Sequence, residues 1–264
     1  MLDRIDVTVP SVARMYDYLL DGKDNYPADR EATEQLLQQV PSMKVLALNN
    51  RDFLRRVVRV LAEDFGIRQF VDHGSGLPAM DNVHEIAQRV HPDARVVYVD
   101  NDPIVLAHGR ALLQHKGDTA VLRADFRDPD AIWESAELKR LIRPDEPVAA
   151  LFVSVLHCIP DSDDPAGVVA RVRDRLPSGS YLVVCQLVSD DELTRRAVTD
   201  FMAEATGGTW GRVRTEEDVQ GFLAGLELVP PGLVEVSTWR ADNELAPKQP
   251  SMEWIEYGGV ARIP

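Results

Sequence analysis

Apolar positions recur at helical spacing in three successive segments of the first 66 residues. The first helix is predicted after Ser11, which can cap it, and the second is predicted to open at Pro27. A third is predicted over about 42–65, with Gly66 as its stop. Its expected apolar face carries Leu46, Asn50, Phe53, Leu54, Val57, Val58 and Leu61. These patterns predict a helical N-terminal cap over residues 1–66.

From residue 68 the pattern changes to short apolar runs that alternate with amphipathic segments. Five runs predict strands, at 69–74, 94–100, 119–125, 148–156 and 180–188. The segments between them predict helices, at 79–90, 103–115, 130–142 and 164–176. Strands that are apolar throughout and separated by helices indicate a parallel sheet covered on both faces.

The last 75 residues break this alternation. Helices are predicted at about 191–205 and 215–225, followed by runs at 227–230, 233–239 and 257–263 with no clear helix between the last two. This ending predicts that an antiparallel strand closes the far edge of the sheet. The expected fold is therefore α/β, a Rossmann-like doubly wound sheet of about seven strands over residues 67–264, preceded by the helical cap.

Charge and cysteine content narrow the classes of partner. The 264 residues include 43 Asp and Glu against 29 Lys and Arg, a net charge of −14, which argues against nucleic-acid and anionic membrane partners. No apolar run reaches the roughly 18 residues that span a bilayer, and the N-terminus has no secretory apolar region, so a cytoplasmic location is expected. Cys158 and Cys185 are predicted to be small core residues on neighbouring strands rather than a disulfide or zinc site.

A glycine-rich turn follows the first predicted strand. Residues 74–79 fit the loose pattern of dinucleotide sites, and Asp100 ends the next strand 24 residues after Gly76. The pattern alone fits two cofactor classes, but Asp72 at the mouth of the turn would repel a pyrophosphate. A carboxylate there suits the ammonium and sulfonium of S-adenosylmethionine. Pro78 is expected at the first position of the following helix, and His73 is expected either to turn into the sheet or to lie beside the ligand.

Further motifs along the chain follow the order of those in class I S-adenosylmethionine-dependent methyltransferases. The matching segments are Asp72-x-Gly74-x-Gly76, Val99 to Pro103, Ala124-Asp125-Phe126, Ser154 to His157 and Leu176 to Gly179. More narrowly, ARMYDYLLDGKDNYPADR and NNRDFLRRVVRVLAEDFGIRQFVDHGSGLP resemble an actinobacterial S-adenosyl methyltransferase family that was first catalogued as a domain of unknown function. The similarity covers essentially the whole chain.

The resemblance implies a role for each matching residue. Asp72 would hold the methionine ammonium, and Gly74, Ser75 and Gly76 would line the methionine and ribose. Asp100 would accept from the ribose hydroxyls, whereas Asp102 would cap the next helix. On the adenine side Asp125 would accept from the amino group, with Asn101 or Phe126 against the ring. Ser154 would pass near the sulfonium, and the wall of the acceptor pocket would include Tyr16, Lys23, Asn25 and Tyr26.

Chemistry at the methyl acceptor stays open at this point. His157, at the end of the fourth strand, is the candidate general base, with a structural or substrate-contacting role as its alternative. Asp161, Asp163 and Asp164 are interpreted as capping and solvated charge, so no metal is expected. A small molecule is the favoured substrate, and the sequence does not define its identity or the oligomeric state. The alternatives are a module that binds S-adenosylmethionine without turnover and, on the glycine pattern alone, an NAD-dependent oxidoreductase.

Overall fold

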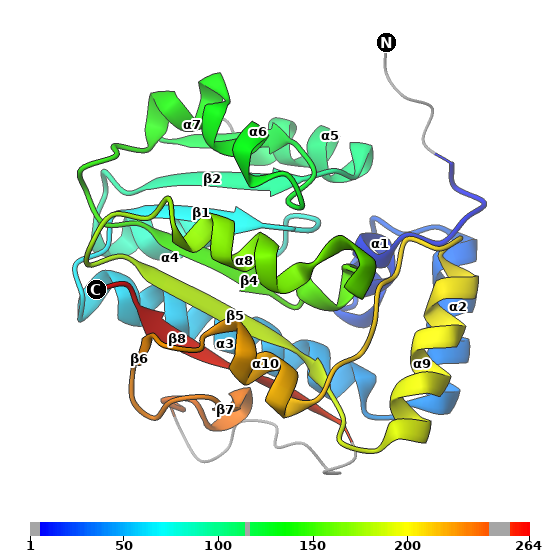
Figure 1. Cartoon of the computed structure of the whole chain (residues 1–264). Coiled ribbons are helices and arrows are strands. Elements are labelled where there is room, and N and C mark those ends of the chain that lie inside the picture. Colours follow the sequence, from blue (N-terminus) through cyan, green and yellow to red (C-terminus); the bar gives the residue numbers. More distant parts are fainter. Residues whose placement is uncertain (1–5, 114–116, 243–253) are drawn as a thin grey trace.

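The computed structural model describes residues 6–113, 117–242 and 254–264. An eight-stranded sheet forms the centre, in the order β3-β2-β1-β4-β5-β8-β6, with β7 also paired to β8 (Figure 1). The parallel strands are β1 (Gln69–His73), β2 (Arg95–Asp100), β3 (Thr119–Arg123), β4 (Ala149–Val153) and β5 (Tyr181–Val188). The antiparallel strands are β8 (Ile255–Arg262) and the two-residue β6 (Glu227–Leu228) and β7 (Val234–Glu235).

Helices cover both faces of the sheet, as the doubly wound prediction requires. One face packs on α3 (Met43–Glu63), α4 (Val83–Val90) and α5 (Pro103–Leu113). The other packs on α6 (Pro129–Glu134), α7 (Ala136–Leu141), α8 (Pro165–Arg173) and α10 (Glu216–Phe222). The Rossmann-like α/β fold class predicted from the sequence is confirmed.

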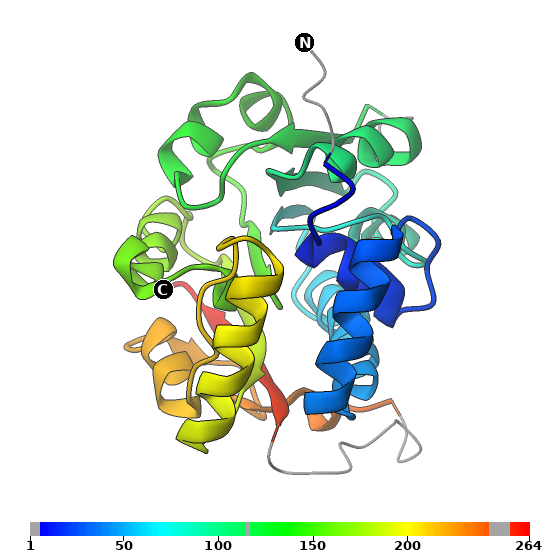
Figure 2. The same cartoon turned by 90° about the vertical axis from the view of Figure 1, so that its right-hand side faces the viewer.

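A third group of helices lies beyond the carboxyl ends of the parallel strands. These are α1 (Val12–Leu19), α2 (Pro27–Gln39) and α9 (Glu192–Ala205), which pack together with the first turns of α3 around a separate apolar core (Figures 1 and 2). Figure 2 looks onto this end, with α2 and α9 in front. Helix α3 runs from this group to the sheet, so it connects the N-terminal helices to the central layer.

Several predicted boundaries are wrong, and each has a local cause. Helix α4 begins at Val83 rather than 79, so Pro78 lies in the preceding loop, because Asn82 caps the helix and the Glu85 carboxylate accepts from the Asn82 amide at 2.7 Å. The single helix predicted over 130–142 is divided at Ser135, whose hydroxyl accepts from the Leu138 amide and starts α7.

The remaining corrections concern the sheet. The strand predicted over 148–156 ends at Val153, and residues 156–158 form a 3₁₀ turn, so Cys158 lies half-buried in this turn while Cys185 is a core residue of β5. The run 233–239 supplies only the two residues of β7. The antiparallel strand β8 lies between β5 and β6 rather than at the extreme edge.

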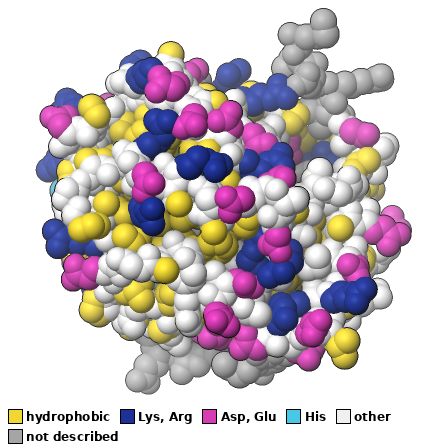
Figure 3. Space-filling view, in the orientation of Figure 1, with side chains coloured by type: hydrophobic (Ala, Val, Ile, Leu, Met, Phe, Trp, Pro, Cys, Tyr) yellow, Lys and Arg dark blue, Asp and Glu magenta, His cyan; other side chains and the backbone are white. Residues whose placement is uncertain are grey.

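The surface carries charges of both signs. Figure 3 shows Lys and Arg intermixed with Asp and Glu over α6, α7, α8 and α10, with no continuous basic area on this face. Within the described ranges, no helix is both long and apolar enough to cross a membrane.

Candidate active site

A cavity of about 910 Å³ opens where the parallel strands end. It is lined by the glycine turn after β1, by the ends of β2 and β4, and by side chains of α1, α3 and α9. Cavities of this size hold drug-sized ligands. Its position matches the general rule that open α/β sheets bind ligands outside the carboxyl ends of their strands.

The glycine turn has the backbone conformation that its sequence predicts. Gly74 and Gly76 have φ of +70° and +66°, in the left-handed region that favours glycine. A Cβ on Gly74 would lie 2.2 Å from Val155 Cγ2, whereas a Cβ on Gly76 would meet no atom within 4 Å. The first glycine is therefore required by packing within the protein, whatever ligand the turn binds.

Asp72, the last but one residue of β1, presents a buried carboxylate to this cavity. Only 5% of the residue is exposed, and among the described residues no donor hydrogen-bonds to its oxygens. Burial raises the pKa of Asp72 to about 7, with a smaller push from Asp100, while Arg51 opposes the shift. A cation entering the cavity would satisfy this carboxylate.

Asp100 ends β2 and holds the glycine turn in place. Its Oδ2 accepts from the Gly76 amide and its Oδ1 from the Asp102 amide, both at 2.9 Å, and burial raises its pKa to about 6. Asp102 caps α5, because its Oδ1 accepts from the Ile104 amide at 2.8 Å. This confirms the capping role predicted for Asp102, whereas the ribose-binding role of Asp100 stays a prediction. Ser11 donates to the other oxygen of Asp102 at 2.6 Å, so the chain before α1 is joined to the site.

Of the residues predicted to bind adenine, Asp125 already has a hydrogen-bond partner within the protein. Asp125, Asn101 and Phe126 all line the cavity. Although burial would raise the pKa of Asp125, hydrogen bonds from Arg127 lower it, with the guanidinium Nε at 3.0 Å from both oxygens. Arg127 therefore occupies part of the accepting capacity predicted for an amino group, and the remaining lone pairs of Asp125 are those that a ligand could use.

His73 turns into the sheet, which confirms the first of its two predicted positions. The residue is fully buried, its Nδ1 lies 3.2 Å from the Leu151 carbonyl oxygen, and its ring stacks on Phe152 at 4.4 Å between centroids. Burial lowers the pKa of His73 to about 4, so the imidazole is neutral at pH 7.

His157 lines the cavity, but its environment weakens it as a base. The ring is buried and stacks on Trp210 at 4.6 Å between centroids. Burial, with a contribution from Arg214, lowers the pKa of His157 to about 3. Ser154 lies beside it on the cavity wall with a φ of +56°, an uncommon conformation for a non-glycine residue.

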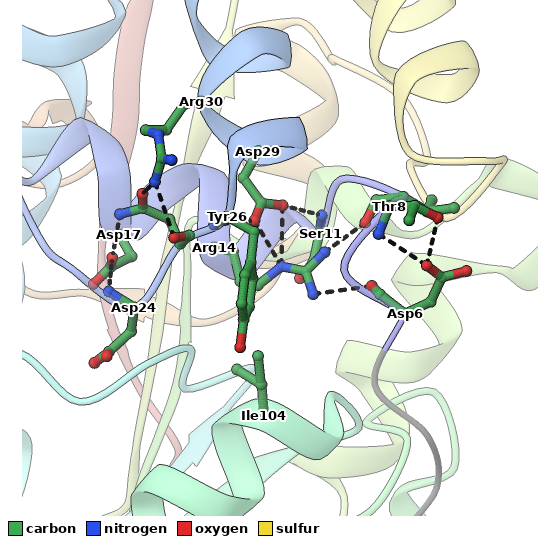
Figure 4. Close-up of polar contacts among 12 residues, drawn as sticks. Asp6, Thr8, Ser11, Arg14, Asp17, Asp24, Tyr26, Asp29, Arg30 and Ile104 are labelled. Carbon is green, nitrogen blue, oxygen red and sulfur yellow. Dashed lines mark hydrogen bonds and ion pairs between the residues drawn. The ribbon is translucent and has the colours of Figure 1, made fainter.

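The four predicted acceptor-pocket residues divide into two pairs. Tyr16 and Lys23 line the cavity, whereas Asn25 and Tyr26 do not. Asn25 donates to the Asp17 carboxylate at 2.9 Å, and the Tyr26 amide donates to Asp29 at 2.8 Å. Both bonds belong to the polar network that joins α1 to α2, and Figure 4 shows Tyr26 in it, with its ring toward Ile104.

An ion pair at the centre of that network was not anticipated. Arg14 Nε lies 3.0 Å from the Asp29 carboxylate, both side chains are almost fully buried, and Asp29 also accepts from the Ser11 amide at 2.9 Å (Figure 4). Asn50 donates to the Tyr16 hydroxyl at 2.7 Å, and Arg51 donates to the Met80 carbonyl at 2.8 Å. The first bond joins α3 to α1, and the second joins α3 to the loop that follows the glycine turn.

Glu256 is the cavity residue that sequence reasoning missed. It lies on β8, is 3% exposed and lines the cavity. Its signal in the sequence is a lone carboxylate in the otherwise uncharged run 254–261, WIEYGGVA. Because a charged residue is rarely fully buried without a partner, a lone carboxylate in an apolar strand indicates a binding position, as it does for Asp72.

Comparison with known proteins agrees with the geometry. Residues 1–264 match a family described as S-adenosyl methyltransferase. A crystal structure from Thermobifida fusca YX, provisionally named a methyltransferase, has 41% identity and a TM-score of 0.91, covering 99% of this chain and 97% of that chain. A DUF574 family protein from Streptomyces avermitilis MA-4680 has 40% identity and a TM-score of 0.90, covering 99% and 100%. No curated protein matches the sequence significantly.

Proposed function

Because the chain belongs to the S-adenosyl methyltransferase family, whose cofactor is S-adenosylmethionine, we propose that it methylates a small organic molecule without the help of a metal. The observation that carries this proposal is the buried Asp72 carboxylate, which no described donor satisfies, beside a left-handed glycine turn. When bound, the cofactor supplies an activated methyl group on a sulfonium.

The residues around the turn fit this cofactor. Asp72 would hold the ammonium, since a buried carboxylate gains most from a positively charged donor. The space in front of Gly76 admits the ligand backbone, and Asp100 keeps lone pairs for the ribose hydroxyls after accepting two amides. Asn101 and Phe126 line the cavity where the adenine would lie.

The walls of the cavity support a small acceptor. Side chains of α1, α3 and α9 close the end opposite the strands, and many of them are apolar: Met15, Leu19, Met43, Leu54, Val198 and Met202. An acceptor must enter this enclosed region to meet the methyl group. Holding the acceptor near the methyl carbon in the correct orientation can supply most of the rate of such a displacement.

The acidic run after β4 supports chemistry without a metal. Asp161 pairs with Arg212 at 2.8 Å and with Arg214 at 2.9 Å, and Asp163 pairs with Arg127. Asp164 caps α8 by accepting from the Gly167 amide at 2.9 Å. Asp164 therefore caps a helix, as predicted, whereas Asp161 and Asp163 neutralise arginines and are not the free solvated charges that the sequence indicated.

Calorimetry tests the proposal directly. Titration with S-adenosylmethionine and S-adenosylhomocysteine is expected to give binding, whereas NAD and NADP are expected to give none; the reverse result would contradict it. Methyl-labelled S-adenosylmethionine, incubated with the protein and a small-metabolite extract, then separates an enzyme from a binding module. Tight binding without any labelled product would favour the module.

A further inference from the structure

Glu256 lies in the same cavity as Asp72 but far from it across the sheet. Strands β4 and β5 separate β1 from β8, a lateral separation of roughly 14 Å at the usual spacing between strands. Asp72 is level with Val183 of β5 through Leu151, whereas Glu256 pairs with Leu187, so the register adds a further separation along the strands. Both side chains are on the face that packs against α3, since Phe70 and Cys185 belong to that core. Glu256 is therefore outside the pocket that Asp72 provides for an ammonium of the cofactor.

The surroundings of Glu256 do not neutralise its charge. Its contacts are the neutral groups Ser154 Oγ, at a long 3.4 Å, and Cys185 Sγ at 3.3 Å. Within the described part of the chain no Lys or Arg pairs with it. Cys185 also contacts Asn50 Oδ1 at 3.1 Å. Glu235 on neighbouring β7 adds a second negative charge nearby, and burial raises the pKa of Glu256 to about 8. At neutral pH the group is therefore largely protonated while the site is empty, and an entering ammonium would favour its ionised form.

The rest of the cavity favours cations as well. Nine Asp and Glu residues line it against four Lys and Arg, and two of those arginines are already engaged, Arg14 with Asp29 and Arg127 with Asp125. Arg51 donates to backbone carbonyls of the loop after the glycine turn. A carboxylate or phosphate acceptor placed near Glu256 would meet like charge, whereas an ammonium would gain an ion pair.

We infer that Glu256 binds the amino group of the methyl acceptor, which makes the substrate an amine, and that its carboxylate takes the proton that this nitrogen must lose. This inference rests on the proposed methyltransferase function. The ammonium gives one proton to Glu256, which leaves a neutral amine and a carboxylic acid. The nitrogen lone pair then forms the new bond to the methyl carbon as the carbon–sulfur bond breaks, and that bonding pair stays on sulfur. The product leaves as an N-methylammonium, and Glu256 returns its proton to solvent.

The environment of Glu256 suits this proton transfer. An ordinary carboxylate is a far weaker base than an alkylamine, because their pKa values differ by about six units. The raised pKa of Glu256 narrows that gap. Ser154 and Cys185 can donate to the carboxylate after the product leaves, so the empty state keeps neutral partners.

Binding to the complex with S-adenosylhomocysteine tests the inference without turnover. The probes are benzylamine, phenethylamine and tryptamine, each compared with the alcohol and the carboxylic acid of the same skeleton. In calorimetry or thermal-shift titrations the amines are expected to bind at least tenfold more tightly than the matched alcohols, and the acids are expected not to bind. Equal binding of amines and alcohols, preference for acids, or no binding by any amine would overturn the inference.

Variants then assign the preference to Glu256. Glu256→Gln keeps the shape but loses the charge, and is expected to weaken amine binding at least tenfold while S-adenosylhomocysteine still binds. Glu227→Gln is the matched control, because Glu227 is exposed on β6 and lies outside the cavity lining, and it is expected to leave amine binding unchanged. An amine affinity that changes less than twofold in Glu256→Gln would also overturn the inference. If the unmodified protein does not bind S-adenosylhomocysteine at all, the result would instead count against the proposed function.

Discussion

Asp72, which we propose holds the ammonium of the cofactor, is expected to make cofactor binding depend on pH. Its pKa lies near 7 in the free protein because the carboxylate is buried without a donor, and an ammonium stabilises only the ionised form. Affinity for S-adenosylhomocysteine is therefore expected to be constant above pH 7 and to fall below it, by at most about tenfold per pH unit. Asp100, with a pKa near 6, adds to the decline at lower pH. Calorimetry between pH 5 and 8.5 measures this profile.

The variant Asp72→Asn isolates the contribution of Asp72. Loss of a hydrogen bond to a charged group costs about 1.5–3 kcal/mol, so binding is expected to weaken by about 10- to 100-fold at pH 8. The decrease in affinity near pH 7 should disappear, so that only the decrease near pH 6, caused by Asp100, remains. Asp145→Asn, on an exposed loop, is the control that should change neither quantity. An unaltered pH profile in Asp72→Asn would show that another group binds the ammonium.

For single residues, the sequence predicts a place in the cavity where the residue lies at the end of a predicted parallel strand. Asp72 and Asp100 were predictable because each lies at a strand end, and such ends meet at one edge of the sheet. Glu256 was not, because its place in the cavity depends on the antiparallel pairing of β8 with β5, in which it lies opposite Leu187. That pairing joins segments about 70 residues apart, and no local pattern specifies its register.

Arg56 connects two elements that are distant in the sequence. Its guanidinium donates to the carbonyls of Trp239 at 3.0 Å and Val236 at 2.6 Å, which joins α3 to the turn after β7. Arg56→Ala would leave the Trp239 carbonyl without a donor, while the Val236 carbonyl would keep only its bond from the Trp239 amide at 3.2 Å. The free energy of unfolding is therefore expected to fall by about 1.5–3 kcal/mol. Urea denaturation measures the loss.

A neighbouring arginine on α3 gives the comparison for that experiment. Arg59 is half-exposed and forms surface ion pairs with Glu63 and Asp242, which are worth at most about 1 kcal/mol. Arg59→Ala should therefore change stability far less than Arg56→Ala. Similar losses in the two variants would mean that the buried hydrogen bonds of Arg56 contribute little.

The ion pair between α1 and α2 is expected to hold the N-terminal wall of the cavity. Asp29 accepts from Arg14, from the Ser11 amide and from the Tyr26 amide (Figure 4). Breaking a buried pair by removing one charge costs about 3–5 kcal/mol. In Asp29→Asn, the amides of Ser11 and Tyr26 should exchange with solvent at least tenfold faster, as measured by hydrogen exchange.

The surface pair of Asp21 with Lys44 provides the control for that measurement, since both side chains are largely exposed. Asp21→Asn should leave the exchange of the two amides unchanged. If Asp29→Asn also leaves it unchanged, other contacts hold α1 in place.

Elements with a long periodic pattern were predicted well, whereas short ones depend on single hydrogen bonds. Helix α3 lies at Met43–Glu63 against a prediction of 42–65, because its apolar stripe continues for 21 residues. The start of α4 and the division at Ser135 were missed, since each is decided by one capping side chain. The run 233–239 has the composition of a strand, but the 3₁₀ turn that Arg56 binds ends β7 after two residues.

The negative charge of the molecule is concentrated in the lining of the cavity. On the face seen in Figure 3, charges of both signs are intermixed, whereas carboxylates outnumber basic residues nine to four in the cavity lining. A net charge of −14 therefore combines with a local excess at the site. Such a field attracts cations and is weakened by salt.

This field should distinguish the cofactor from its product. S-adenosylmethionine carries a net charge of +1 because of the sulfonium, whereas S-adenosylhomocysteine is neutral overall and keeps the same ammonium, ribose and adenine. Raising NaCl from 50 to 500 mM shortens the screening length to a few ångströms, and is expected to weaken binding of S-adenosylmethionine roughly threefold more than binding of S-adenosylhomocysteine. Parallel calorimetric titrations at the two salt concentrations measure the ratio. Equal salt dependence would mean that the excess of carboxylates acts only through direct contacts with the ammonium. A selective loss for the sulfonium form would instead show that the field of the cavity favours the charged cofactor over the neutral product, which assists product release after methyl transfer.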